Sequence, residues 1–103
     1  MVELSIVIPV YNEERNVIIL YEELKLVLDN LKKTYEIIFV DDGSKDGTNK
    51  EIKNLTNKDK KVKLITFRKN FGQTAALDAG FKNSKGKIII TIDGDLQNDP
   101  KDI

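Results

Sequence analysis

The sequence has 103 residues, enough for one small domain, which we assign to residues 1–103. Its 17 Lys and Arg balance 17 Asp and Glu, and the resulting zero net charge argues against a general nucleic-acid or anionic-membrane surface. The absence of Cys and His excludes disulfides, thiolate nucleophiles and the commonest transition-metal ligands, so a bound metal has to be a hard ion such as Mg²⁺ or Mn²⁺ held by oxygen atoms.

Apolar runs alternate with helix-like segments along the whole chain. In chain order we predict strand Leu4–Val10, helix Glu14–Lys33, strand Glu36–Val40, helix Thr48–Asn57, strand Lys61–Phe67, helix Gly72–Asn83 and strand Lys87–Ile92. Alternation at this spacing is typical of a parallel sheet with right-handed crossovers. The predicted fold class is therefore α/β, a three-layer αβα Rossmann-like domain with about four parallel strands.

The first helix carries the clearest amphipathic pattern. The apolar positions expected on its buried face are Val17, Leu20, Leu24, Val27 and Leu31. Asn12 or a neighbour is expected to cap this helix, and the Glu13–Glu14 pair suits its positive end.

Each predicted strand is followed by a polar cluster. The clusters are Tyr11-Asn12-Glu13, Asp41-Asp42-Gly43-Ser44, Arg68-Lys69-Asn70-Phe71-Gly72 and Asp93-Gly94-Asp95-Leu96-Gln97. Because the carboxyl ends of parallel strands lie at one edge, where open α/β sheets bind ligands, these clusters predict a single site.

The spacing of Asp93 and Asp95 allows both carboxylates to reach one divalent cation, with Gln97 as a neutral oxygen ligand. Such an ion stabilises charge on a departing diphosphate. The alternative is an ordinary polar turn.

Two other clusters also have two interpretations. Asp41 and Asp42 are suited to bind a base or ribose hydroxyls, or they belong to a turn in which Ser44 or Asp46 caps the next helix. Arg68 and Lys69 either pair with phosphate or are solvated surface charges.

Taken together, in order and with this spacing, the four clusters resemble the family-two inverting nucleotide-sugar glycosyltransferases, whose fold is called GT-A. Asn70-Phe71-Gly72-Gln73 and Asp95-Leu96-Gln97-Asn98 look like the polyprenyl-phosphate branch of that family, which includes dolichol-phosphate mannose synthases. The resemblance implies a sheet order of 3-2-1-4. It also implies a donor-binding half truncated from a longer enzyme.

The resemblance further implies a role for each matching residue. Substrate-binding roles fall on Pro9, Tyr11, Glu13, Asp41, Asp42, Ser44, Arg68, Asn70, Gly72 and Asp93, and metal-binding roles on Asp93, Asp95 and Gln97. The implied reaction is a single displacement with inversion, from a UDP- or GDP-sugar to a lipid phosphate. No catalytic base is identified in this chain. Gly94 and Asp99 depart from the residues common in relatives.

Two alternatives remain at this stage. One is a haloacid-dehalogenase-type phosphatase, whose strand also ends in Asp-x-Asp; the other is a non-catalytic α/β module or fragment. No leader and no apolar run of ~20 residues is present, so we expect a cytoplasmic chain, with membrane association of a longer parent left open. Homo-oligomer formation through exposed apolar surface is also left open.

Overall fold

The computed structural model describes residues 1–93. The elements of this part of the chain, in order, are β1 (Leu4–Val10), α1 (Val17–Leu31), β2 (Tyr35–Asp41), α2 (Thr48–Lys58), β3 (Val62–Thr66), α3 (Gln73–Lys82) and β4 (Ile88–Thr91). This order confirms the predicted alternation of strands and helices. Most boundaries differ from the predicted ones by a residue or two at either end, and the largest difference is at the start of α1.

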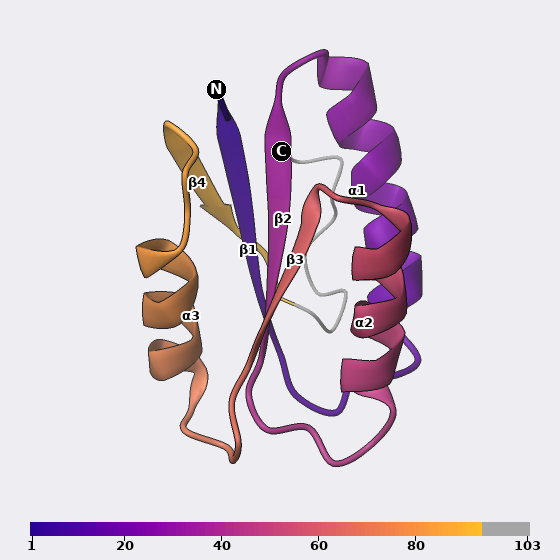
Figure 1. Ribbon diagram of the computed structural model, residues 1–103, viewed down its shortest axis with the longest axis vertical. Coiled ribbons are helices and arrows are strands. Elements are labelled where there is room, and N and C mark those ends of the chain that lie inside the picture. Colours follow the sequence, from indigo (N-terminus) through magenta and orange to yellow (C-terminus); the bar gives the residue numbers. More distant parts are fainter. Residues whose placement is uncertain (94–103) are drawn as a thin grey trace.

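The strands form one sheet in the order β3-β2-β1-β4, with every neighbouring pair parallel. This confirms the predicted fold class and strand order. Val10 at the end of β1 lies opposite Asp41 at the end of β2, which in turn lies opposite Thr66 at the end of β3. The carboxyl ends of these strands therefore meet at one edge. Helices α1 and α2 cover one face and α3 covers the other, which gives three layers (Figure 1).

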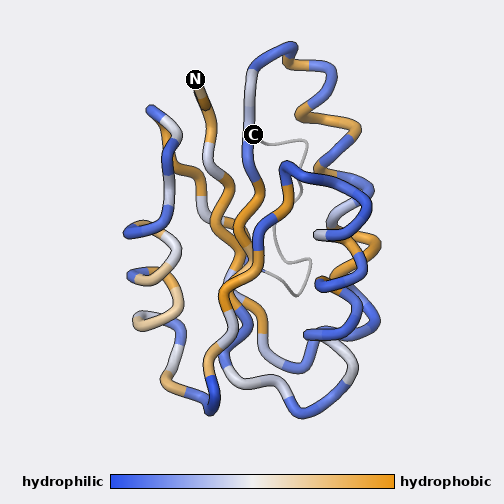
Figure 2. Tube along the Cα trace, in the orientation of Figure 1, coloured by the Kyte–Doolittle hydropathy of each residue, from blue (hydrophilic) through white to orange (hydrophobic). Residues whose placement is uncertain are grey.

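Alternate residues of the central strands supply two apolar cores. The side facing α1 and α2 holds the larger cluster, which includes Ile6 and Ile8 of β1, Phe39 of β2 and Leu20 of α1. The smaller cluster, facing α3, includes Val40. In Figure 2 the trace of the central strands is predominantly orange, whereas the traces of α1 and α2 carry much blue. Burial on both faces explains why β1 and β2 are nearly continuous apolar runs.

Helix α1 begins three residues later than predicted, at Val17. The expected cap was wrong, because Asn12 adopts a left-handed conformation with φ 52° and uses its side-chain oxygen to accept a hydrogen bond from the amide of Lys45. Asn16 occupies the capping position without a side-chain cap. The residues before Val17 therefore serve the contact between two loops instead of the helix.

The buried row of α1 also differs at its end. The buried residues are Val17, Leu20, Leu24 and Leu28. Leu28 continues the spacing of four from Leu24, whereas Val27 is displaced from it by about 100° around the helix axis. Leu31 is the last helical residue and is 40% exposed. The predicted assignments of Val27 and Leu31 to the core were therefore wrong.

Strand β4 is less enclosed than its sequence suggests. Ile88 and Ile89 are 58% and 42% exposed, whereas Ile92 just beyond the strand is buried. The strand lies at the edge of the sheet, next to β1. Among residues 1–93, no helix has the length and apolar character needed to cross a membrane.

Candidate functional site

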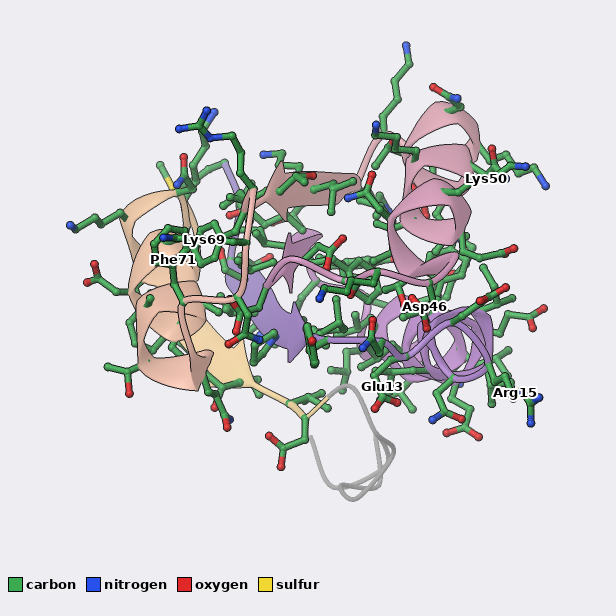
Figure 3. The ribbon with its side chains drawn as sticks, turned by 90° about the horizontal axis from the view of Figure 1, so that it is seen from below. Glu13, Arg15, Asp46, Lys50, Lys69 and Phe71 are labelled. Atoms are coloured by element: carbon green, nitrogen blue, oxygen red, sulfur yellow. The ribbon has the colours of Figure 1, made fainter. Side chains whose placement is uncertain are left out.

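The candidate site is the edge of the sheet where the strands end. Figure 3 looks onto this edge, with Lys69 and Phe71 on the side of α3 and with Glu13 and Asp46 on the side of α1 and α2. Arg15 points outward, away from the sheet, in the same view. The structure thus brings together loops that are more than 50 residues apart in the sequence, as the strand order requires.

Side chains and backbone amides join the loops after β1 and β2. The Asn12 amide donates to Ser44 Oγ at 2.8 Å, and Asn12 Oδ1 accepts from the Lys45 amide at the same distance. The Glu13 amide donates to Thr48 Oγ1 at 2.8 Å. These bonds fix the segment that carries Tyr11 and Glu13 against the start of α2. These bonds therefore hold this side of the site in a fixed position.

Glu14 and Asp46 extend the same connection. Glu14 Oε1 accepts from the Gly47 amide at 2.9 Å, and Asp46 Oδ1 accepts from the Thr48 amide at 2.9 Å. Burial alone would raise the pKa of Asp46, but the hydroxyl and amide of Thr48 and the amide of Glu14 outweigh it and lower the pKa below 3.8. Gly47 occupies the capping position of α2, so neither Ser44 nor Asp46 is the cap residue. Asp46 nevertheless accepts the first amide of the helix, whereas the Ser44 hydroxyl bonds Asn12.

Asp41 is the last residue of β2 and is only 1% exposed. Its Oδ1 accepts from the Ser44 amide and its Oδ2 from the Asn49 side chain, both at 2.9 Å. Asn49 also donates to Thr66 Oγ1 at 2.9 Å, so this carboxylate links the ends of two strands through α2.

Asp42 is directed to the other side of the edge. Its Oδ1 accepts from the Phe71 amide at 2.7 Å and its Oδ2 from the Gly72 amide at 3.0 Å. Both bonds lie at the start of α3, and only 5% of the surface of Asp42 is exposed. The carboxylate therefore occupies the start of that helix.

The remaining residues predicted for the site also lie at this edge. Pro9 is paired with Val40 near the end of β1, and Tyr11 is 41% exposed just beyond it. Glu13 Oε2 accepts from the Asn16 side chain at 2.7 Å. Asn70 donates to the backbone oxygen of Asp42 at 3.3 Å, and Arg68 is exposed.

Asp93 follows β4 and is joined to α3. Its Oδ1 accepts from Gln73 Nε2 at 3.3 Å. Asp95 and Gln97, the other predicted metal ligands, lie outside the described residues. Within residues 1–93 no group of three acidic side chains is arranged to hold a metal. Asp93 fits a hard divalent cation by its chemistry, because a partly exposed carboxylate is the kind of ligand that Mg²⁺ and Mn²⁺ accept.

The described part of this edge carries more acidic than basic side chains. Its acidic side chains are Glu13, Glu14, Asp41, Asp42, Asp46 and Asp93, and its basic side chains are Arg15, Lys45, Arg68 and Lys69. Many nucleotide-binding folds hold phosphate at a helix start. Here Asp42 already occupies the start of α3, and Asp46 and Glu14 occupy the start of α2. A diphosphate placed there would meet like charge.

Sequence reasoning missed three residues that organise this edge: Thr48, Asn49 and Gln73. Each has a partner in another loop or strand: Thr48 accepts from the Glu13 amide, Asn49 donates to Asp41 and Gln73 donates to Asp93. Local spacing does not reveal these partners. Gln73 belongs to the Asn-Phe-Gly-Gln segment noted for its resemblance.

Comparison with known proteins identifies close relatives. The family described as Glycosyl transferase family 2 matches residues 5–103. An uncharacterized glycosyltransferase of Synechocystis, sll0501, is 47% identical over 97% of the chain and 31% of its own length. The dodecaprenyl-phosphate galacturonate synthase of Rhizobium johnstonii is 42% identical over 98% of the chain and 30% of its own length. The chain thus spans about three tenths of the length of these relatives.

Solved structures share the fold. The crystal structure of S. aureus TarS 1-349 in complex with UDP matches 90% of the chain and 27% of its own, with a TM-score of 0.72 and 25% identity. The mannosyltransferase PcManGT of Pyrobaculum calidifontis, in complex with GDP-Man and Mn²⁺, matches the same share of this chain with a TM-score of 0.70 and 22% identity.

Proposed function

Because the chain belongs to glycosyl transferase family 2, we propose that it forms the donor-binding domain of a longer enzyme. The proposed reaction transfers a sugar from a UDP- or GDP-sugar to a polyprenyl phosphate with inversion at the anomeric carbon. Support for the acceptor comes from the dodecaprenyl-phosphate enzyme of Rhizobium, which is 42% identical to this chain. Support for the donor comes from the UDP bound by TarS on the same fold.

The observation that carries the proposal is the gathering of polar loops at one acidic edge. A nucleotide diphosphate is itself an anion, and the helix starts that could offset its charge are already occupied by carboxylates. Binding at this edge therefore needs added positive charge. Arg68 and Lys69 supply part of it, and a divalent cation at Asp93 supplies the rest.

Each residue has a proposed role in binding. Pro9, Tyr11 and Glu13 line the pocket for base and ribose. Asp41, which is 1% exposed, supports them through its bonds to Ser44 and Asn49. Ser44 holds the Asn12 turn beneath that pocket. Arg68 and Asn70 shape the side of the site next to α3.

We propose that Asp93 and Asp95 hold Mg²⁺ or Mn²⁺, with Gln97 as a further oxygen ligand. When bound, this ion stabilises the negative charge on the departing diphosphate. The acceptor phosphate is largely ionised near neutral pH, because its second pKa is about 6, so it attacks without the general base that a sugar hydroxyl needs.

Isothermal titration calorimetry tests the proposal directly. UDP and GDP are each titrated into the protein with Mn²⁺ and again with EDTA. We expect one nucleotide to bind in Mn²⁺ and to lose at least about tenfold in affinity in EDTA. Asp93→Asn is expected to reproduce the effect of EDTA, because it removes the carboxylate charge. Failure of both nucleotides to bind in Mn²⁺ would overturn the proposal.

The family match leaves the haloacid-dehalogenase alternative without support. The other alternative is a non-catalytic module. To distinguish it from a transferase, a UDP- or GDP-sugar and a polyprenyl phosphate are added to the full-length protein, and formation of the sugar-lipid is measured.

A further inference from the structure

An aromatic side chain is exposed at the site edge, on the loop between β3 and α3. Phe71 is 57% exposed. Its ring is nevertheless supported, because Phe67 packs edge-on against it with the ring centroids 5.7 Å apart and an interplanar angle of 85°. Phe67 in turn packs against the smaller apolar cluster, which includes Val40. The Phe71 ring is therefore held outside the core in a fixed position.

Two cationic side chains accompany this ring. Lys69 Nζ lies over the Phe71 ring, 5.2 Å from its centroid, and Arg68 is exposed next to Lys69 in the sequence. The backbone that carries them is in close contact with the loop after β2, since a Cβ added to Gly43 would lie 2.4 Å from the Lys69 carbonyl carbon. We call Arg68, Lys69 and Phe71 together the basic aromatic loop.

The charges of the edge are divided between its two sides. In Figure 3, Lys69 and Phe71 lie on the side of α3, whereas Glu13 and Asp46 lie on the side of α1 and α2. Asp93 is also joined to α3, but in the proposed function a cation offsets its charge. The α3 side of the edge is therefore locally basic, although the whole chain has no net charge.

An exposed ring beside two cations has the chemistry of a contact with lipid. Aromatic rings bury their apolar body at the boundary between headgroups and acyl chains. Each Lys or Arg near an anionic leaflet adds electrostatic attraction, and the apolar stem of a Lys can lie along the boundary while its ammonium group stays in water. A soluble phosphate would engage the cations alone and would leave the exposed Phe71 ring without a partner.

We infer that the basic aromatic loop contacts an anionic membrane surface, with the Phe71 ring inserted among the headgroups. The inference rests on the proposed function, because a polyprenyl phosphate presents its phosphate at a membrane surface. The loop is also close to the proposed cation site, since Gln73 at the start of α3 donates to Asp93 at 3.3 Å. Contact through Phe71 therefore brings this side of the site to the lipid phosphate.

Tryptophan fluorescence tests the contact. The sequence contains no Trp, so Phe71→Trp introduces a single reporter. This variant is mixed at low ionic strength with vesicles of equal parts phosphatidylcholine and phosphatidylglycerol that carry bromine on their acyl chains. We expect its emission to shift to shorter wavelength and to be quenched, and we expect the quenching to weaken when added salt screens the cations. Absence of quenching would overturn the inference.

Phe81→Trp is the matched control. Phe81 is 44% exposed and also has a lysine beside it, but Lys82 is paired with Asp78 at 3.1 Å. It lies in the last turn of α3, about 12 Å along the helix axis from Gln73. We expect the emission of this variant to be unchanged by the vesicles. Equal quenching at both positions would mean that the protein adsorbs without a preferred face, and the inference would fail.

The lipid composition identifies what the ring at position 71 contacts. One titration uses vesicles without polyprenyl phosphate, and a second uses vesicles that contain it. A membrane contact predicts quenching in both. Quenching only in the second would mean that the ring contacts the isoprenoid chain of the acceptor, and equal quenching by vesicles without phosphatidylglycerol would remove the role of the cations. Either result would contradict the inference.

Sugar transfer by the full-length enzyme gives a second readout. Phe71→Ala is expected to raise the KM for polyprenyl phosphate in vesicles at least about fivefold, because apolar contact with the lipid is lost. Its kcat and its nucleotide affinity by calorimetry should stay at wild-type values, and Phe81→Ala should change none of the three. A loss of nucleotide affinity in Phe71→Ala would place the ring in the donor site and would refute the inference, as would an unchanged KM.

The two readouts separate this inference from the proposed function. If the wild-type enzyme transfers no sugar, the proposed function fails, whereas quenching in Phe71→Trp still decides the membrane contact. Circular dichroism checks that each variant folds. If Phe71→Trp does not fold, the KM of Phe71→Ala decides alone.

Discussion

Glu36 provides the sharpest test of how this fold supports its site. It lies on β2 with only 2% of the residue exposed, and its Oε1 accepts from Lys63 Nζ at 2.6 Å. Its Oε2 accepts from Ser5 Oγ and from the Lys85 amide, each at 2.6 Å. Ser5 Oγ also accepts from the Gly86 amide at 2.8 Å. One carboxylate therefore joins three strands to the turn that leads into β4 and hence to Asp93.

Replacing Glu36 with Ala removes the three bonds that its carboxylate accepts and leaves only the Gly86–Ser5 bond. Ser5 is fully buried, and an unsatisfied buried donor costs about 1–3 kcal/mol. Lys63 is 43% exposed at its side chain and can reach water, so the full penalty of about 3–5 kcal/mol for an abandoned buried charge does not apply. We expect Glu36→Ala to lower the free energy of unfolding by about 2–3 kcal/mol, and Glu36→Gln by about 1–2 kcal/mol because the amide retains one acceptor oxygen.

Urea unfolding at pH 7, followed by circular dichroism, measures both changes. Asp78→Ala is the control, because Asp78 pairs with Lys82 at 3.1 Å but both side chains are more than 60% exposed. An exposed pair of this kind contributes about 0–1 kcal/mol. If Glu36→Ala costs no more than Asp78→Ala, the carboxylate does not hold the strands together and the reasoning is wrong.

The pH dependence gives an independent check. Burial alone would raise the pKa of Glu36, but the bonds from Lys63, Ser5 and the Lys85 amide outweigh it and lower the pKa below 4.5. The folded-state pKa is thus below the unfolded one, so the stabilisation is present above pH 4.5 and is lost as pH falls through the folded-state value. The stability difference between wild type and Glu36→Gln should therefore shrink on acidification, and a difference that grows would contradict this sign.

Two further substitutions test packing, and a third tests a hydrogen bond. Gly80→Ala places a Cβ 2.3 Å from Val7 Cγ1, so we expect a loss of about 1–3 kcal/mol in thermal unfolding despite the better helix propensity of Ala; a more stable variant would refute this. Gly43→Ala should also destabilise, by at least about 1 kcal/mol, because its Cβ meets backbone and its φ is +75°, and wild-type stability would disprove the contact. Tyr21→Phe removes a 2.6 Å bond to Asp59 and should cost about 0.5–1.5 kcal/mol in urea without changing nucleotide binding.

The fold was predictable because its signals are local. The apolar runs of β1 and β2 and the period of α1 report burial directly, and right-handed crossovers then limit the topology. Boundaries were less predictable where tertiary contacts override local preference. Asn12 has the chemistry of a helix cap, but it contacts Lys45, 33 residues away. The residues next to Asn12 in the sequence do not indicate that Lys45 is its partner.

The site was predictable as a location rather than as a set of contacts. Strand ends converge in any parallel sheet, so the four polar clusters had to share an edge. Which atoms of Asp41 and Asp42 face a ligand depends on the backbone of other loops. Asp42 bonds Phe71 and Gly72, 29 and 30 residues further along the chain, and no local spacing predicts these partners.

These contacts bear on how the proposed diphosphate would bind at a small acidic edge. Carboxylates that satisfy helix starts hold the loops rigid, but they also remove the positive ends that would attract phosphate. In the proposed function, the same residues that order the site therefore make diphosphate binding dependent on an added cation. Neutralising Asp42 without loss of fold should consequently relax the metal requirement. Comparing the ratio of nucleotide affinities in Mn²⁺ and in EDTA between wild type and Asp42→Asn measures this effect, and an increased ratio in the variant would contradict it.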